Sequence, residues 1–183
     1  MQRVYRWHPS EGVGLEHLIL RVMGDVIVAE AVVIGDRGDG PFGCTYRICC
    51  DACWRVRSVD VHAAGGESRV LTTDGSGTWR DGDGAALPAL DGCLDVDISA
   101  TPFTNTLPIR RLGARLRQRT PIRVVYIPVP ELDLHCAEQA YTWLAPERYL
   151  YEGPIGAFEA ELEVDPNGVV VHYPALFHRL PGA

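Results

Sequence analysis

Lysine is absent from this 183-residue chain, so every basic side chain other than its six histidines is an arginine. Without lysine the chain cannot contain a phosphate-binding loop of the G-x4-G-K-S/T type, and it also lacks a G-x-G-x-x-G between strand and helix. Acidic residues outnumber arginines by 24 to 17, which gives a net charge of -7. Binding to nucleic acid depends on a basic face, so we expect neither a nucleotide cofactor nor a nucleic-acid partner.

Long apolar runs are missing as well. No segment approaches the roughly 20 apolar residues of a membrane span, and the first residues lack the apolar core and cleavage site of a signal peptide. We therefore expect a cytoplasmic protein. Composition does not change along the chain, which predicts a single domain over residues 1–183 that is large enough to bury a core without metals or disulfides.

Familiar catalytic and metal-binding signatures are also absent. The chain has no G-x-S-x-G and no H-E-x-x-H, and its histidines are scattered. Cys50 and Cys53 have the C-x2-C spacing of zinc and redox sites, but no second pair follows. Alternation of apolar residues around Cys50 favours a strand in which cysteine acts as a small apolar filler. We expect no metal and no cofactor, and a redox role of the cysteine cluster stays open.

Short strands separated by glycine-containing turns dominate the rest of the sequence, which is typical of a mainly β protein. The clearest hairpin has apolar residues alternating with acids over residues 158–165, followed by a Pro166-Asn167-Gly168 turn. Residues 15–34 are ambiguous by pattern, and we predict strands there. Residues 136–144 are equally compatible with a helix and a strand.

Residues 90–112 carry the most information, because their period changes halfway. The first half alternates as a strand, and the face opposite its apolar residues carries Asp95 and Asp97. In the second half Thr104 or Asn105 can cap a short helix, in which Pro108 is tolerated in the first turn. The sequence therefore predicts a polar cluster on a sheet, next to a short helix.

Two aspartates two residues apart on a strand place their carboxylates roughly 6 to 7 Å apart, within the range of an inverting glycosidase. The same spacing is common on solvated strand faces. Arg110 and Arg111 could neutralise these acids or hold an anionic group of a ligand, or they could form a structural ion pair. The residues alone leave a solvated face, a binding pocket and a catalytic site open.

A bacterial family described as putative glycolipid-binding is similar to this chain at residues 91–111, Asp-Gly-Cys-Leu-Asp-Val-Asp-Ile-Ser-Ala-Thr-Pro-Phe-Thr-Asn-Thr-Leu-Pro-Ile-Arg-Arg. The likeness continues at residues 74–79, 126–130, 139–141 and 164–174. Glu16 and residues 51–54 also look like family positions, so the likeness covers nearly the whole chain. It implies a many-stranded antiparallel sheet curled as a spiral β-roll around one short helix, remotely like lipoprotein-carrier folds. It also implies a homodimer and an acidic pocket. The short helix would fit residues 106–112.

From the resemblance and the local pattern we expect non-enzymatic binding of a glycolipid or related amphiphile in an acidic pocket. Carboxylates accept hydrogen bonds from sugar hydroxyls, and aromatic faces cover the apolar side of a sugar ring. The candidate ligand-binding residues are Glu16, Asp51, Trp54, Trp79, Asp95, Asp97, Arg110, Arg111 and Tyr141. The alternatives are a carboxylate-dependent glycoside hydrolase and a dimeric interaction protein without a small ligand.

Overall fold

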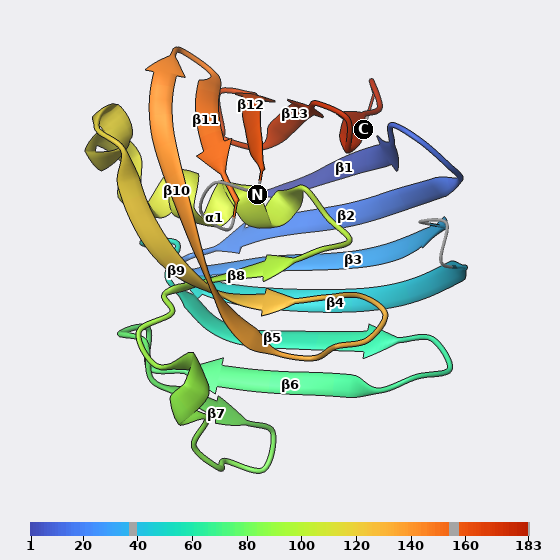
Figure 1. Ribbon diagram of the computed structural model, residues 1–183, viewed down its shortest axis with the longest axis vertical. Coiled ribbons are helices and arrows are strands. Elements are labelled where there is room, and N and C mark those ends of the chain that lie inside the picture. The colour runs from blue at the N-terminus through green and yellow to red at the C-terminus, as the bar shows by residue number, and fades with distance from the viewer. Residues whose placement is uncertain (37–39, 154–157, 183) are drawn as a thin grey trace.

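The computed structural model describes residues 1–36, 40–153 and 158–182, which form one long sheet curled around a short helix (Figure 1). The strands are β1 (Gln2–Pro9), β2 (Gly14–Met23), β3 (Val26–Asp36), β4 (Pro41–Asp51), β5 (Val56–Ala63), β6 (Ser68–Thr73), β7 (Trp79–Asp81), β8 (Asp95–Ile98), β9 (Thr120–Ile127), β10 (His135–Ala145), β11 (Arg148–Glu152), β12 (Glu159–Val164), β13 (Val170–Tyr173) and β14 (Phe177–Arg179). The helical segments are α1 (Thr106–Leu112) and the 3-10 turns η1 (Pro88–Leu90), η2 (Phe103–Asn105) and η3 (Gly113–Arg117).

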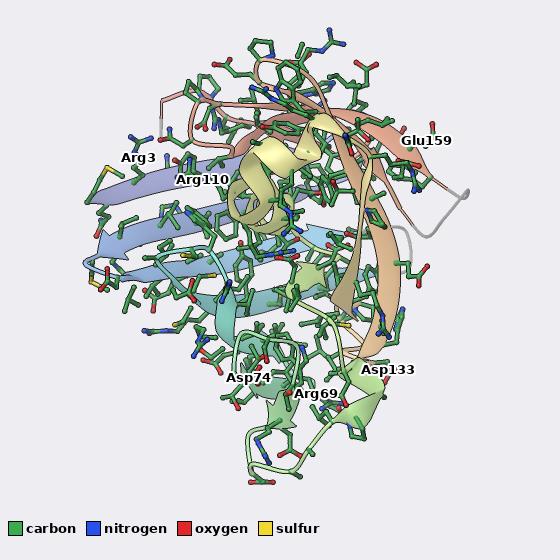
Figure 2. The ribbon with its side chains drawn as sticks, turned by 90° about the vertical axis from the view of Figure 1, so that its left-hand side faces the viewer. Arg3, Arg69, Asp74, Arg110, Asp133 and Glu159 are labelled. Atoms are coloured by element: carbon green, nitrogen blue, oxygen red, sulfur yellow. The ribbon has the colours of Figure 1, made fainter. Side chains whose placement is uncertain are left out.

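The sheet is open, and its 14 strands follow the order β7-β6-β5-β4-β3-β2-β1-β14-β13-β12-β11-β10-β9-β8. We call β1 to β7 the first wing and β8 to β14 the second wing. The two wings join where β1 pairs with β14. In Figure 2, β1 with Arg3 lies on one side, β12 with Glu159 lies on the other, and α1 with Arg110 lies between them. This arrangement confirms the prediction of a mainly β sheet curled around one short helix.

One pairing departs from the expected antiparallel sheet. β8 runs parallel to β9, with Asp95 opposite Val124 and Ile98 opposite Ile127. The chain between these strands passes through η2, α1 and η3, and such a crossover returns it to the sheet in its original direction. The alternation of side chains has the same period in both kinds of pairing, so it could not have distinguished them.

The predicted hairpin near the end of the chain is confirmed. Alternate residues of β12 are buried, while Glu159, Glu161 and Glu163 are exposed. The turn that follows is held by the Asp165 carboxylate, whose Oδ1 accepts hydrogen bonds from two backbone N–H groups at 2.8 and 3.1 Å. Gly168 closes this turn with a φ of 78°, a conformation that glycine adopts at little cost.

The two ambiguous segments are strands. Residues 15–34 fall in β2 and β3, as predicted, and residues 136–144 fall in β10. In β2 the alternate residues Glu16, Leu18 and Leu20 are buried, which is the period of a strand. The helical spacing of Leu15, Leu18 and Ile19 is therefore incidental, and the buried row begins with a carboxyl group.

The helix at residues 106–112 is confirmed, but its predicted side-chain cap is wrong. Asn105 already has helical φ and ψ, because η2 leads directly into α1. Its side-chain amide donates to the Pro102 carbonyl at 3.1 Å, and its Oδ1 accepts from the Tyr141 hydroxyl at 2.8 Å. Pro108 lies in the first turn, where a backbone N–H is not needed.

Most of the core lies on the inner face of the first wing and beneath α1. Cys44 and Cys50 are buried in it, which confirms the prediction that cysteine fills apolar space in β4. All six cysteines are free thiols. Within the described ranges, no three His, Cys, Asp or Glu side chains are grouped so that they could hold a metal ion. Neither α1 nor any other described helix combines the length and apolarity needed to cross a membrane.

Candidate functional site

A cavity of about 920 Å³ lies between the two wings. Its size is near the top of the range of roughly 300 to 1,000 Å³ that small-molecule sites have. The first wing contributes residues of β1 to β4, and the second contributes residues of β8 to β11, β13 and β14. Three groups of lining residues have different character. We define a polar end (Glu16, Asp97, Thr101, Asn105 and Gln139), an aromatic wall (Trp7, Tyr126, Tyr151, Tyr173 and Phe177) and an apolar rim (Phe42, Phe158 and Leu176).

Glu16 of β2 is the most deeply buried carboxyl group of this lining, with 2% of its surface exposed. Its Oε1 accepts hydrogen bonds from the Tyr46 hydroxyl at 2.5 Å and the Thr101 hydroxyl at 2.8 Å. Its Oε2 is buried and has no hydrogen-bond partner. Burial raises the pKa of Glu16 to about 8, although the two hydroxyls favour the charged form. Glu16 therefore carries a proton at neutral pH.

Asp97 of β8 lies in the same lining and accepts hydrogen bonds from two different elements. The Thr104 hydroxyl donates to Oδ1 at 3.1 Å, and the side-chain amide of Gln139 donates to Oδ2 at 2.6 Å. Thr104 comes from η2 and Gln139 from β10, so the carboxylate is fixed between the helical crossover and the second wing. A carboxylate fixed in this way is a preorganised acceptor for the hydroxyl groups of a ligand.

Tyr141 lies one layer behind the polar end. It is buried, and its hydroxyl holds the side chain of Asn105, which reaches the cavity. Its ring packs against Tyr151 of the aromatic wall, with ring centres 5.2 Å apart. Tyr141 thus supports two lining residues without lining the cavity itself.

The aromatic wall comes from both wings. Trp7 of β1 is directly opposite Glu16 in the β1–β2 pair, and its indole N–H donates to the Val170 carbonyl at 2.9 Å. The rings of Tyr151 and Tyr173 meet edge to face, 5.9 Å apart. Burial raises the pKa of both tyrosines, so their hydroxyls stay neutral hydrogen-bonding groups. An aromatic wall beside buried polar groups suits a molecule with both an apolar and a polar part.

Asp95 and Arg111 lie outside this lining and bind one another. The Arg111 side chain donates to both carboxylate oxygens of Asp95, which is fully buried. Asp95 and Asp97 are two residues apart on β8, yet only Asp97 is among the residues that line the cavity. The ion pair that the sequence offered as one alternative is therefore present for Arg111, and it ties α1 to β8.

The remaining predicted site residues also lie outside the cavity lining. Asp51 closes the β4–β5 turn, where its Oδ1 accepts from the backbone N–H groups of Cys53 and Arg55. Trp54 follows in that turn, and the Arg110 guanidinium carbon is 5.2 Å from the centre of its ring. Trp79 is fully buried, and its indole N–H donates to the Cys93 carbonyl at 2.8 Å. The structure thus brings together Glu16, Asp97 and, behind them, Tyr141 from the predicted set.

Sequence reasoning missed several residues of the cavity, among them Trp7, Gln139, Tyr151 and Tyr173. Gln139 and Tyr173 fall in segments that carry the family resemblance, but their roles depend on strands that are distant in the sequence. Gln139 is 42 residues from Asp97, and Thr101 is 85 residues from Glu16. No local spacing could have grouped them.

Two comparisons with known proteins found a match. A family model described as putative glycolipid-binding matches residues 4–179. The crystal structure of a DUF1089 family protein from Pseudomonas aeruginosa is similar to this chain, with 45% sequence identity and a TM-score of 0.82. The match covers 93% of this chain and 94% of that one. No curated protein matches the chain.

Proposed function

Because the chain belongs to the family described as putative glycolipid-binding, we propose that it binds a glycolipid or a related amphiphile in the cavity between the wings. In this proposal the protein binds its ligand without catalysing a reaction. Asp97 and Glu16 bind the polar headgroup, and the aromatic wall contacts the apolar face of its sugar ring.

One observation carries the proposal: the buried carboxyl group of Glu16, the half-buried one of Asp97 and an aromatic wall line the same cavity. Sugars offer hydroxyl groups that a fixed carboxylate accepts, and the apolar faces of their rings pack on tyrosine and tryptophan. The Asp97 carboxylate has the required fixed geometry, since Thr104 and Gln139 both donate to it. The family description points to the same class of ligand.

Organic extraction and native mass spectrometry of the purified protein test this function. We expect a glycolipid or a related amphiphile to co-purify with the wild type and to be strongly depleted in Asp97→Asn. Loss of a hydrogen bond to a charged group weakens binding by about 10-fold to 100-fold. Glu163→Gln is the matched control, because Glu163 is an exposed acid of β12. An amphiphile that is absent from the wild type, or equally abundant in all three proteins, would contradict the proposal.

The hydrolase alternative named Asp95 and Asp97 as its acid and base. In the structure Arg111 engages both oxygens of Asp95, and Asp95 is fully buried outside the cavity lining. Of the two aspartates, only Asp97 therefore has a carboxyl group that a substrate in the cavity could reach, so binding is the better supported function. Turnover of chromogenic glycosides between about pH 4 and pH 8, abolished by Asp97→Asn, would revive hydrolysis. A dimeric state and a bacterial cytoplasmic location remain predictions.

A further inference from the structure

The lining of the cavity combines buried polar residues with exposed apolar ones. Glu16, Thr101 and Gln139 of the polar end are each no more than 3% exposed. Phe158 and Leu176 of the apolar rim are 38% and 39% exposed. Buried polar groups and exposed apolar side chains therefore belong to the same cavity, whose exposed lining also includes Glu11, Asp36 and His135. A headgroup that reaches the buried polar groups leaves its alkyl chain on the side of the exposed Phe158 and Leu176.

We propose that the ligand enters headgroup first, so that an uncharged glycosyl group binds at Glu16 and Asp97 while the alkyl chain extends over the apolar rim. This inference rests on the proposed function and adds the orientation and the charge class of the ligand. The two acids have complementary roles, because Asp97 accepts hydrogen bonds and Glu16 donates one.

Glu16 is the donor because of how its two oxygens are used. Oε1 already accepts hydrogen bonds from the hydroxyl groups of Tyr46 and Thr101. Oε2 is buried and has no hydrogen-bond partner. A buried polar atom without a partner costs free energy, and a ligand atom that pairs with it removes that cost. Burial favours the protonated carboxyl group, so Glu16 can donate a hydrogen to an acceptor such as a ring or hydroxyl oxygen of a sugar.

Charge in the lining argues for an uncharged headgroup. Four acids, Glu11, Glu16, Asp36 and Asp97, belong to the described lining, which includes no arginine. An anionic headgroup such as a phosphate would lie next to carboxyl groups with no guanidinium from these lining residues to bind it. Anion sites in proteins normally use arginine forks or other cationic donors.

The neighbouring residues suit the other end of the ligand. Phe158 packs against Tyr173 with ring centres 6.2 Å apart, so the aromatic wall continues into the rim. Exposed phenylalanine and leucine at the opening give an alkyl chain an apolar surface as it leaves the cavity.

Quenching of Trp7 fluorescence by two spin-labelled alkyl glucosides tests the orientation. Trp7 is fully buried and pairs with Glu16 across β1 and β2, so it reports on the polar end. One glucoside carries its nitroxide on the alkyl carbons next to the glycosidic oxygen, and the other carries it at the end of the chain. The same titrations on Trp7→Phe measure the quenching of the other three tryptophans, which is subtracted from that of the wild type.

We expect the nitroxide near the headgroup to quench the Trp7 emission several-fold more than the terminal one. Stronger quenching by the terminal nitroxide, or equal quenching by both, overturns the headgroup-first orientation but leaves the proposed function intact. Failure of both glucosides to bind contradicts the proposed function instead. A second measurement needs no variant: the terminal nitroxide in the wild-type complex should remain accessible to a paramagnetic nickel complex in water, while the nitroxide near the headgroup is shielded. Shielding of the terminal nitroxide would overturn the orientation as well.

Discussion

Arg111 donates hydrogen bonds to both carboxylate oxygens of Asp95, from Nε to Oδ1 at 3.0 Å and from Nη2 to Oδ2 at 2.5 Å. Burial raises the pKa of Asp95 even though the Arg111 guanidinium acts to lower it. Desolvation of the Asp95 carboxyl group thus outweighs the effect of the guanidinium on its pKa. The ion pair positions α1 on β8, next to the strand residue that reaches the cavity.

Breaking this pair on one side should destabilise the protein more than replacing both members. Arg111→Met leaves a buried carboxylate unpaired, and we expect a loss of about 3 to 5 kcal/mol in the free energy of unfolding. Combining Arg111→Met with Asp95→Leu should recover much of that loss. Urea denaturation of the three proteins measures it, with Arg148→Met, at an exposed pair with Glu161, as the control. A double variant less stable than the single one would contradict this account.

Glu16 should make stability fall as the pH rises. Its pKa is about 8 in the folded protein and 4.5 in its ordinary state, so the unfolded chain loses this proton first. The contribution is fully present below pH 4.5 and is lost as the pH rises toward 8. We expect Glu16→Gln to be less sensitive to pH than the wild type over this window. Denaturation at several pH values measures it, and the exposed Glu163→Gln should follow the wild type. Identical slopes for Glu16→Gln and wild type would refute a protonated Glu16.

Three histidines stack where the wings join. His178 lies between His8, at 5.4 Å, and His172, at 4.4 Å between ring centres. The pKa of His178 is lowered by desolvation and by the charges of His172 and His8. The contribution of His178 to stability should therefore be fully present above its ordinary pKa of 6.5. It should be lost as the pH falls through the lower pKa of the folded protein. Tm measured from pH 8 to pH 5 should drop less in His178→Gln than in the wild type. The control is His62→Gln, at an exposed histidine, and parallel curves for all three would contradict the prediction.

Tyr141 should affect the site without contacting the ligand. Tyr141→Phe removes the hydroxyl that binds Asn105 Oδ1 and leaves this buried acceptor unpaired, at a cost of about 1 to 3 kcal/mol. We expect lower stability in urea and weaker binding of an alkyl glucoside. Tyr149→Phe, at a half-buried tyrosine of β11 outside the lining, should change neither. Unchanged binding in Tyr141→Phe would remove Tyr141 from the account of the site.

Local sequence patterns predicted the elements that depend on neighbouring residues. The β12–β13 hairpin follows from period-two alternation and a turn that needs Gly168, and α1 follows from a change of period and Pro108 in its first turn. Both features are determined within about a dozen residues of chain. The parallel pairing of β8 with β9 is determined by a crossover, so alternation alone did not reveal it.

The site depended on contacts that the sequence does not express locally. Asp95 and Asp97 are equivalent in the pattern of β8, yet Arg111 takes the first and Gln139 contacts the second. Glu16 was named only by the family resemblance, because a carboxyl group in a buried row contradicts the usual preference of acids for water. Its environment comes from Tyr46 and Thr101, which are 30 and 85 residues away.

Titration calorimetry with a short alkyl glucoside tests the central claim most directly. We expect heat of binding for the wild type and for Glu16→Gln, whose amide can still donate a hydrogen bond. We expect no heat of binding for Glu16→Leu. For Asp97→Asn we expect binding with an affinity about 10-fold to 100-fold lower than that of the wild type. The hydroxyl oxygens of Tyr46 and Thr101 lie 3.2 Å apart, so these two groups can hydrogen-bond to each other in Glu16→Leu. This contact should keep that variant folded. Equal affinity in the wild type and Glu16→Leu, or no heat in any folded protein, would contradict binding at the polar end of this cavity.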